Sequence, residues 1–136
     1  MSERRDEKEE GRFAYEGLDR VMHEKARLGI MTSLATHQEG LLFNELKELC
    51  SLTDGNLSRH IQVLQEAGLI EVWKRFQDRR PQTLCRLSPE GRKRFISYLE
   101  EMERVLKDAY SAQANEAKKK SARFLKNPDI QGWTPA

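Results

Sequence analysis

The sequence predicts a mainly α-helical fold with one small β-hairpin, an α+β arrangement, and a long terminal helix. Three observations lead to this prediction. Apolar residues recur at spacings of three and four along much of the chain, which is the period of amphipathic helices. Residues 69–87 instead alternate in steps of two on both sides of a polar, proline-containing tip, as a hairpin does. A 4-3-4-3 apolar stripe then runs through a final helix at 89–117, and this stripe is longer than the core of one small domain can cover.

The first helix is predicted from Phe13 to about Ala35, with Asp19 and Glu24 on its solvent face. Its apolar positions are Leu18, Val21, Met22, Leu28, Met31 and Leu34. Residues 36–40 are polar and end it, and the short apolar run at 41–43 is expected to form a brief edge strand.

Two further helices follow across a tight turn. The second spans Asn44 to Cys50, with Asn44 as its N-cap. Its expected buried face consists of Leu46, Leu49 and Cys50. In the third helix, Thr53 or Asp54 is expected as the N-cap, and Gly68 occupies the C′ position. The inward stripe of this helix consists of Leu57, Ile61, Leu64 and Ala67.

The hairpin and the last helix complete the chain of elements. On the first strand, Ile70, Val72, Lys74 and Phe76 alternate with polar or larger residues. Ser88 is expected to cap the last helix, with Pro89 in its first position. The apolar stripe of that helix consists of Phe95, Leu99, Met102, Leu106 and Ala109.

Composition restricts the class of protein. The 136 residues are 38% hydrophobic and 34% charged, which fits one soluble domain. No run of 18 apolar residues predicts a membrane span, and the N-terminus lacks the apolar segment of a secretory signal, so a cytoplasmic location without membrane contact is expected. Cys50 and Cys85 are interpreted as free, small apolar residues.

Catalytic and metal chemistry has no motif in this sequence. The three histidines, His23, His37 and His60, stand far apart, without cysteines or carboxylates at metal-ligand spacing. Nucleophile, phosphate-loop and metalloprotease motifs do not occur either. We therefore predict that the protein is not an enzyme and needs no cofactor or metal.

The order of elements predicts a helix-turn-helix followed by a wing, which is the name given to such a hairpin. The third helix would bury its apolar stripe and project its polar N-terminal face, as a helix that reads the major groove does. Asparagine can bond adenine and arginine guanine at base edges. The hairpin adds a local positive charge, because residues 73–86 contain five basic residues and one acid, Asp78. The candidate contacts to double-stranded DNA are Asn56, Ser58, Arg59 and Gln62 on the helix, and Lys74, Arg75, Arg79 and Arg80 on the hairpin.

Residues 18–102 resemble the winged helix-turn-helix regulators of the MarR/ArsR type. The resemblance lies in "LDRVMHEKARLGIMTSL", "LLFNELKELCSLTDGNLSRHIQVLQEAGLIEV" and "RPQTLCRLSPEGRKRF". It implies a homodimeric transcription factor that binds a near-palindromic site, with DNA contacts that include His60 beside Arg59. For His60, a bond to a phosphate or to the wing is an alternative. The metal-ligand pattern of the ArsR sensors does not occur in this sequence.

The resemblance also implies that the last helix and the N-terminal helix form the dimer interface. The apolar face of the last helix beyond about Leu99 supports this independently, because one small domain cannot cover it. The predicted interface residues are Leu18, Met22, Leu99, Met102, Leu106 and Ala109. The predicted organisation is a charged arm at 1–12, the winged domain at 13–88, the dimerisation helix at 89–117 and a basic, loose tail at 118–136.

Two alternatives stay open from the sequence. A winged helix can also serve as a protein–protein docking module, and apolar residues on the third helix would favour that use. Regulators of this type often respond to a small molecule, so an unidentified effector is a possible partner. Trp73, Phe76 and Tyr98 could line a pocket for it, although core packing explains them equally well. Trp133 in the tail has no assigned role.

Overall fold

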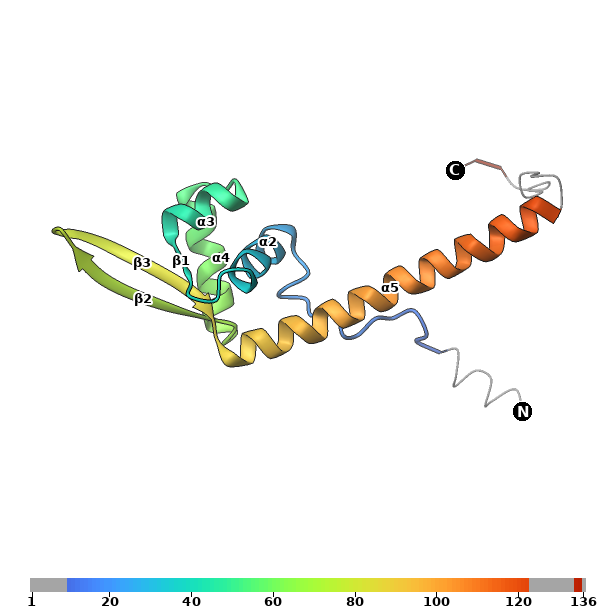
Figure 1. The fold of residues 1–136 in the computed structure, drawn as a ribbon, viewed down its shortest axis with the longest axis horizontal. Helices are drawn as coiled ribbons and strands as arrows, with labels where there is room; N and C mark the ends of the chain where they lie inside the picture. Colours follow the sequence, from blue (N-terminus) through green and yellow to red (C-terminus); the bar gives the residue numbers. More distant parts are fainter. Residues whose placement is uncertain (1–9, 123–133, 136) are drawn as a thin grey trace. The chain divides into compact units, whose positions relative to one another are not determined.

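The computed structural model describes residues 10–122 and 134–135, with side chains described through Lys118 and again at 134–135. Trp133 and most of the predicted arm and tail lie outside these residues. The chain forms two compact units, one up to Met102 and one from Glu103 onward. The elements, labelled in Figure 1, are α2 (Lys25–Ala35), β1 (Leu41–Leu42), α3 (Phe43–Cys50), α4 (Asp54–Glu66), β2 (Ile70–Gln77), β3 (Arg80–Leu87) and α5 (Pro89–Ala122).

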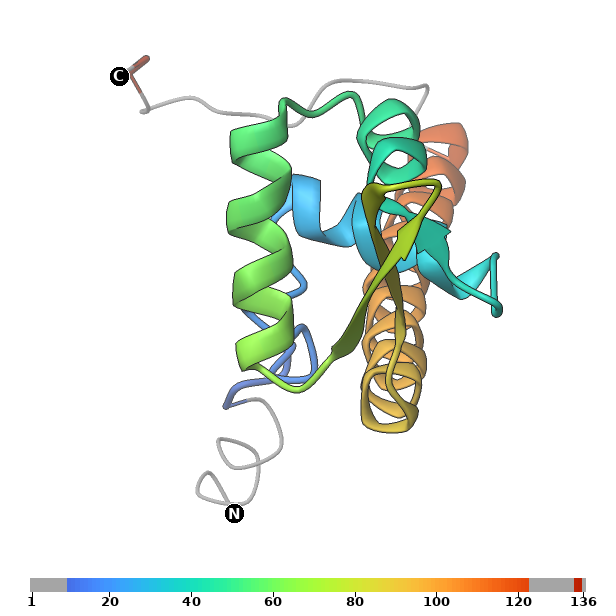
Figure 2. The same cartoon turned by 90° about the vertical axis from the view of Figure 1, so that its left-hand side faces the viewer.

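The predicted fold class is confirmed: helices surround the base of a three-stranded antiparallel sheet, and the hairpin extends beyond them (Figures 1 and 2). The strand order is β1-β3-β2. The brief edge strand predicted at 41–43 pairs with β3, with Leu41 opposite Cys85. The hairpin itself is in register from Ile70 opposite Leu87 to Gln77 opposite Arg80. The two strands of the hairpin therefore lie where the alternation of apolar and polar residues predicted them.

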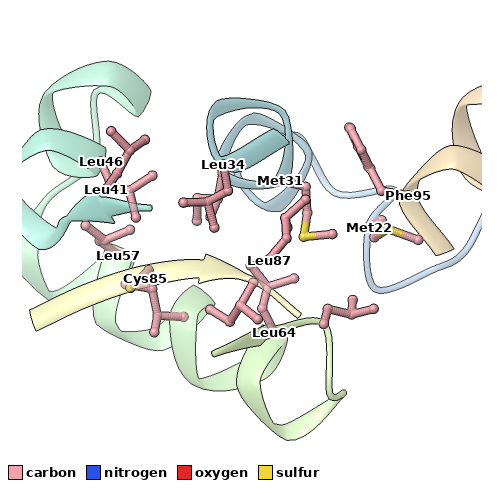
Figure 3. Close-up of a cluster of buried hydrophobic side chains, with 14 of the residues drawn as sticks. Met22, Met31, Leu34, Leu41, Leu46, Leu57, Leu64, Cys85, Leu87 and Phe95 are labelled. Atoms are coloured by element: carbon pink, nitrogen blue, oxygen red, sulfur yellow. The ribbon is translucent and has the colours of Figure 1, made fainter. Parts of the chain in front are cut away.

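One hydrophobic core joins the helices to the base of the sheet (Figure 3). Helix α4 contributes Leu57, Ile61 and Leu64, which are three of the four residues of the predicted stripe and are all buried. Burial of each such side chain contributes about 1.5–3 kcal/mol. The fourth residue of the stripe, Ala67, is the C-cap of the helix and is only partly buried. Cys85 lies in the same core, where burial raises the pKa of its thiol to about 11. Its interpretation as a small apolar core residue is therefore confirmed.

The first helix is shorter than predicted, because it begins at Lys25 and not near Phe13. The two acidic residues expected on its solvent face instead bind backbone amides. Glu24 caps α2 by accepting from the amides of Ala26 and Arg27. Asp19 accepts from the Val21 amide at 2.8 Å, which stabilises a turn. A short acidic side chain competes in this way with the helical hydrogen bonds of its neighbours.

Helix α3 also differs from its prediction at both ends. It begins at Phe43, so Leu42 and not Asn44 is the N-cap, and the Glu45 carboxylate accepts from the Leu42 amide at 2.8 Å. Of the expected buried face, Leu46 is buried, whereas Leu49 is 57% exposed. The helix is short and only one narrow side of it meets the core, which leaves Leu49 outside.

The start of α5 is hydrogen-bonded to the residues that follow α4. Ser88 caps α5 as predicted, since its hydroxyl accepts from the Gly91 amide at 2.8 Å and donates to the Gly68 carbonyl at 2.7 Å. A Cβ at Gly91 would lie 1.8 Å from the Leu69 carbonyl oxygen, so only glycine allows this approach. Helix α5 continues to Ala122, past the predicted end at 117, because the sequence there consists of good helix formers.

Candidate nucleic-acid interface

The N-terminal part of α4 presents a polar surface to solvent. Asn56, Ser58, Arg59 and Gln62 are all exposed, on the side of the helix away from the buried stripe. The helix starts as predicted, because the Thr53 hydroxyl accepts from the Asn56 amide at 3.2 Å. Gln62 also donates to Glu66 at 3.2 Å along the helix. The exposed side chains are thus carried by a helix whose start and inner face are both fixed.

An ion pair that sequence reasoning missed lies beside this surface. Lys47 of α3 approaches Asp54, the first residue of α4, with Nζ 2.9 Å from Oδ1. The Asp54 side chain is 72% exposed and would otherwise repel a phosphate. Lys47 offsets that charge and links the two helices across the turn. The signal in the sequence was weak, because the two residues belong to different helices.

His60 occupies a different environment from its neighbour Arg59. Its side chain is only 19% exposed, and its Nδ1 lies 3.5 Å from the Glu24 carboxylate at the start of α2. The hydrogen bond from the Ala26 amide lowers the pKa of Glu24, burial opposes this, and the Arg27 amide and the charges of His60 and Arg27 lower it further. The structure places His60 toward α2, an arrangement that neither sequence alternative described. The exposed surface of α4 therefore contains Asn56, Ser58, Arg59 and Gln62 but not His60.

The outer half of the hairpin carries the four predicted basic residues. Lys74, Arg75, Arg79 and Arg80 are all exposed, and Arg75 donates to Gln82 across the strands at 2.8 Å. The turn has positive φ at both central residues, +52° at Asp78 and +65° at Arg79, which makes it type I′. This turn type is usual in two-residue hairpins. A positive φ strains the backbone of a residue other than glycine, and neither central residue of this turn is glycine.

The fifth basic residue of the hairpin, Arg86, is neutralised within the sheet. Its Nε lies 2.7 Å from the Glu71 carboxylate on the neighbouring strand, and its guanidinium lies 5.3 Å from the centre of the Trp73 ring. Trp73 also donates to Glu71 at 3.2 Å. The hydrogen bonds from Arg86 and Trp73 hold the pKa of Glu71 below its ordinary value. The sequence has five basic residues between 73 and 86. Because Arg86 is paired with Glu71, the positive charge of the hairpin is concentrated at residues 74–80.

Three aromatic residues considered as a pocket lining do not meet. Trp73 is 53% exposed on one face of β2, Phe76 is 80% exposed on the other face, and Tyr98 is buried in the core beside His23. The interpretation of these residues as one pocket is therefore wrong. In the described part of the chain, histidines, cysteines and carboxylates form no group of three with metal-site geometry.

The residues predicted for a dimer interface divide by burial. Met22 is 1% exposed inside the core of its own chain, so it has almost no surface left for a second chain. Leu18 and Met102 are partly buried against the same core. Leu99 and Leu106 are each 46% exposed, and Ala109 is exposed as well. In the part of the chain that the structure describes, every helix is too short or too polar to span a bilayer.

Comparison with known proteins agrees with this geometry. A family model described as a winged helix DNA-binding domain matches residues 26–106. An uncharacterized protein of Methanocaldococcus jannaschii, MJ0432, is 38% identical over 66 residues, which cover 48% of this chain and 72% of that protein.

Solved structures show the same fold. A transcriptional regulator homologue from Pyrococcus horikoshii OT3 is 26% identical, with a TM-score of 0.62 over 80% of this chain and 98% of that chain. The Staphylococcus aureus MepR–DNA complex is 20% identical, with a TM-score of 0.60 over 89% and 97% of the two chains. These matches confirm the predicted resemblance to winged helix-turn-helix regulators. They also confirm the prediction that the family binds DNA and is not a family of enzymes. With the family model covering more than half of its length, the chain belongs to the winged helix DNA-binding domain family.

Proposed function

We propose that the protein is a transcriptional regulator that binds DNA sequence-specifically as a homodimer on a near-palindromic operator. The observation that carries the proposal is the exposed polar N-terminal face of α4, anchored from behind by buried leucines and isoleucine. Asn56 and Arg59 supply the side chains that read adenine and guanine edges in the major groove. Ser58 and Gln62 complete the same surface.

The hairpin supplies a second contact to the same duplex. It extends from the same unit as α4, beyond the helices (Figure 1). Lys74, Arg75, Arg79 and Arg80 would neutralise phosphates or enter the narrow minor groove. The polar character of the exposed α4 face also favours DNA over the alternative of a protein-docking module, which would need apolar side chains there.

Helix α5 provides the basis for the homodimer. Four large apolar side chains on it, at spacings of three, seven and four, stay 46–63% exposed: Ile96, Leu99, Leu106 and Tyr110. Such a one-sided stripe is the usual seam between two helices. Ala109 lies beside this stripe in the sequence, whereas Met22 has too little exposed surface to contribute. A charge in the seam, Leu106→Glu, should convert the dimer to monomers in sedimentation equilibrium, and an unchanged mass would contradict this interface.

The test of DNA recognition is selection of bound duplexes from a random pool with the purified full chain, followed by binding measurements on the selected operator. If a dimer neutralises about six phosphates, log K should fall against log salt with a slope near −5. Arg59→Ala should cost about 1–3 kcal/mol and relax one base position in a repeated selection. Arg80→Ala should weaken binding to all duplexes by similar factors.

Lys93→Ala is the matched control, because it removes one exposed positive charge from α5, outside both proposed contact regions. It should change operator affinity far less than either arginine variant. An Arg59→Ala protein that bound the selected operator as tightly as the wild type would refute the assignment of α4 as the recognition helix.

A further inference from the structure

Near the end of the hairpin, the apolar side chain of Phe76 is not buried. Phe76 is 80% exposed, the highest value among the large apolar side chains that the structure describes. Its partner across the strands is Pro81, which is exposed as well. Neither side chain belongs to the hydrophobic core or packs at its edge. Packing among the described residues therefore gives no reason for a phenylalanine at this position.

Strand register shows which face of the hairpin carries this pair. Side chains alternate along a strand, so Phe76 shares its face with Ile70 and Val72. Ile70 and Val72 pack on the core that also contains the buried residues of α4. Phe76 thus extends the face of the hairpin that is turned toward α4. Trp73 lies on the opposite face, where Glu71 and Arg86 hold it.

The charges around Phe76 point to a nucleic acid as its partner. Lys74 precedes it on the same face, and Arg79 and Arg80 follow at the turn, with Asp78 as the only acid between 74 and 81. An apolar side chain ringed by cations suits a polyanion that also offers apolar base surfaces. Duplex DNA presents both at the minor groove, where phosphates flank the edges of stacked bases.

We propose that Phe76 inserts as an apolar wedge between two base pairs in the minor groove, and that it bends the operator there. This inference rests on the proposed function, because it assumes that α4 occupies the adjacent major groove. Wedge insertion partly unstacks one base step and kinks the duplex away from the inserted side chain. Because TA and CA steps unstack most easily, the operator should contain such a step where the hairpin lies. Phe76 would then select sequence without any hydrogen bond to a base.

The experiment uses the full chain and the operator obtained by selection. The duplex carries 2-aminopurine at the flexible step, whose fluorescence rises on unstacking, and a donor and acceptor dye at its two ends, which report bending. The wild type should raise the 2-aminopurine signal and increase energy transfer. Phe76→Ala should lose both signals and bind on the order of tenfold more weakly. Phe76→Leu, which keeps an apolar wedge, should retain most of both.

Trp73→Ala is the matched control, since it removes an exposed aromatic ring from the opposite face of the same strand. It should leave the bend intact. A Phe76→Ala protein that binds and bends the operator like the wild type would overturn the wedge, while the Arg59→Ala result would still support α4 as the recognition helix. A wild-type protein that enriches no duplex at all would overturn both the wedge and the proposed function.

Discussion

Helix α4 and the outer half of the hairpin, residues 74–81, present polar and basic groups in opposite ways. Helix α4 is fixed along its length by buried Leu57, Ile61 and Leu64. In residues 74–81 every side chain is exposed, and cross-strand pairing is the main restraint. A fixed helix can hold hydrogen-bonding groups in the geometry that base readout needs, whereas an extended hairpin end can follow the shape of a groove. The two regions thus suit direct and indirect readout, respectively.

The ends of α4 sharpen the contrast. Thr53 and the Lys47–Asp54 ion pair hold its start. At its end, Gly68 adopts the left-handed φ of +75° that the sequence prediction required. Arg94 of α5 donates to the Ala67 carbonyl at 3.3 Å and pairs with Asp19. In the part of the chain that the structure describes, the hairpin tip has no comparable support from other elements.

The largest expected effect comes from the anchor of α4. Leu57→Ala should lower the free energy of unfolding by about 2–5 kcal/mol, because Leu57 is completely buried and its loss leaves a cavity. Denaturant unfolding measures this. Leu49→Ala, which truncates a leucine that is 57% exposed on α3, should change stability by less than about 0.5 kcal/mol. Equal effects of the two substitutions would contradict the assignment of α4 as a core helix.

The support behind the end of α4 should depend on pH. Burial raises the pKa of Asp19, but hydrogen bonds from Arg94 and from the Val21 and Met22 amides, together with the charge of Arg94, outweigh burial. The pKa therefore lies below its ordinary value of 3.8. The stabilisation by ionised Asp19 is complete above pH 3.8 and is lost as the pH falls through the folded-state pKa.

Asp19→Asn should therefore reduce the free energy of unfolding by about 1.5 kcal/mol at neutral pH, and by progressively less as the pH falls below 3.8. Urea midpoints of the variant and the wild type across pH measure the difference. Glu39→Gln changes an exposed carboxyl in the loop after α2 and should alter the free energy of unfolding at neutral pH by less than about 0.5 kcal/mol. A gap that stays constant through the acid range would refute the role of Asp19 ionisation.

The N-cap of α4 should contribute a smaller amount. Thr53→Ala removes the acceptor of the Asn56 amide and should cost about 1 kcal/mol in thermal or denaturant unfolding. Thr53→Ser keeps the hydroxyl and should restore most of the loss. If alanine and serine were equally destabilising, the contribution of Thr53 would come from its methyl group and not from the cap.

The smallest expected effect is at the hairpin tip and has opposite signs for folding and binding. Arg79→Gly should stabilise the fold by about 0.5 kcal/mol, because glycine adopts the φ of +65° without strain. It should also weaken DNA binding by removing a cation. Arg80→Gly is the control for folding, since Arg80 does not have a positive φ and glycine offers it no relief. A destabilised Arg79→Gly protein would contradict the strained turn.

Patterns that depend on near neighbours were predicted well. The stripe of α4, the Thr53 cap, the glycine at 68, the hairpin and the Ser88 cap all follow from spacings of at most four residues or from strand alternation. The exposure of Asn56, Ser58, Arg59 and Gln62 follows directly from the stripe that opposes them. The failures share a different cause. Residues 13–24 have helical spacing, but Asp19 and Glu24 bind backbone amides, and Arg94 and His60 from distant elements pair with these carboxylates.

By itself, the sequence determined the order of elements and the two faces of α4, because helical and strand periods are local and the burial of apolar side chains drives both. Only the tertiary structure decided where charged groups find partners. It joined Lys47 to Asp54 and Arg86 to Glu71, brought His60 near Glu24, and among the described residues left Phe76 outside the hydrophobic core. Charge pairs and exposed surfaces depend on residues that are distant in the chain and adjacent in space, so only the folded arrangement fixes them.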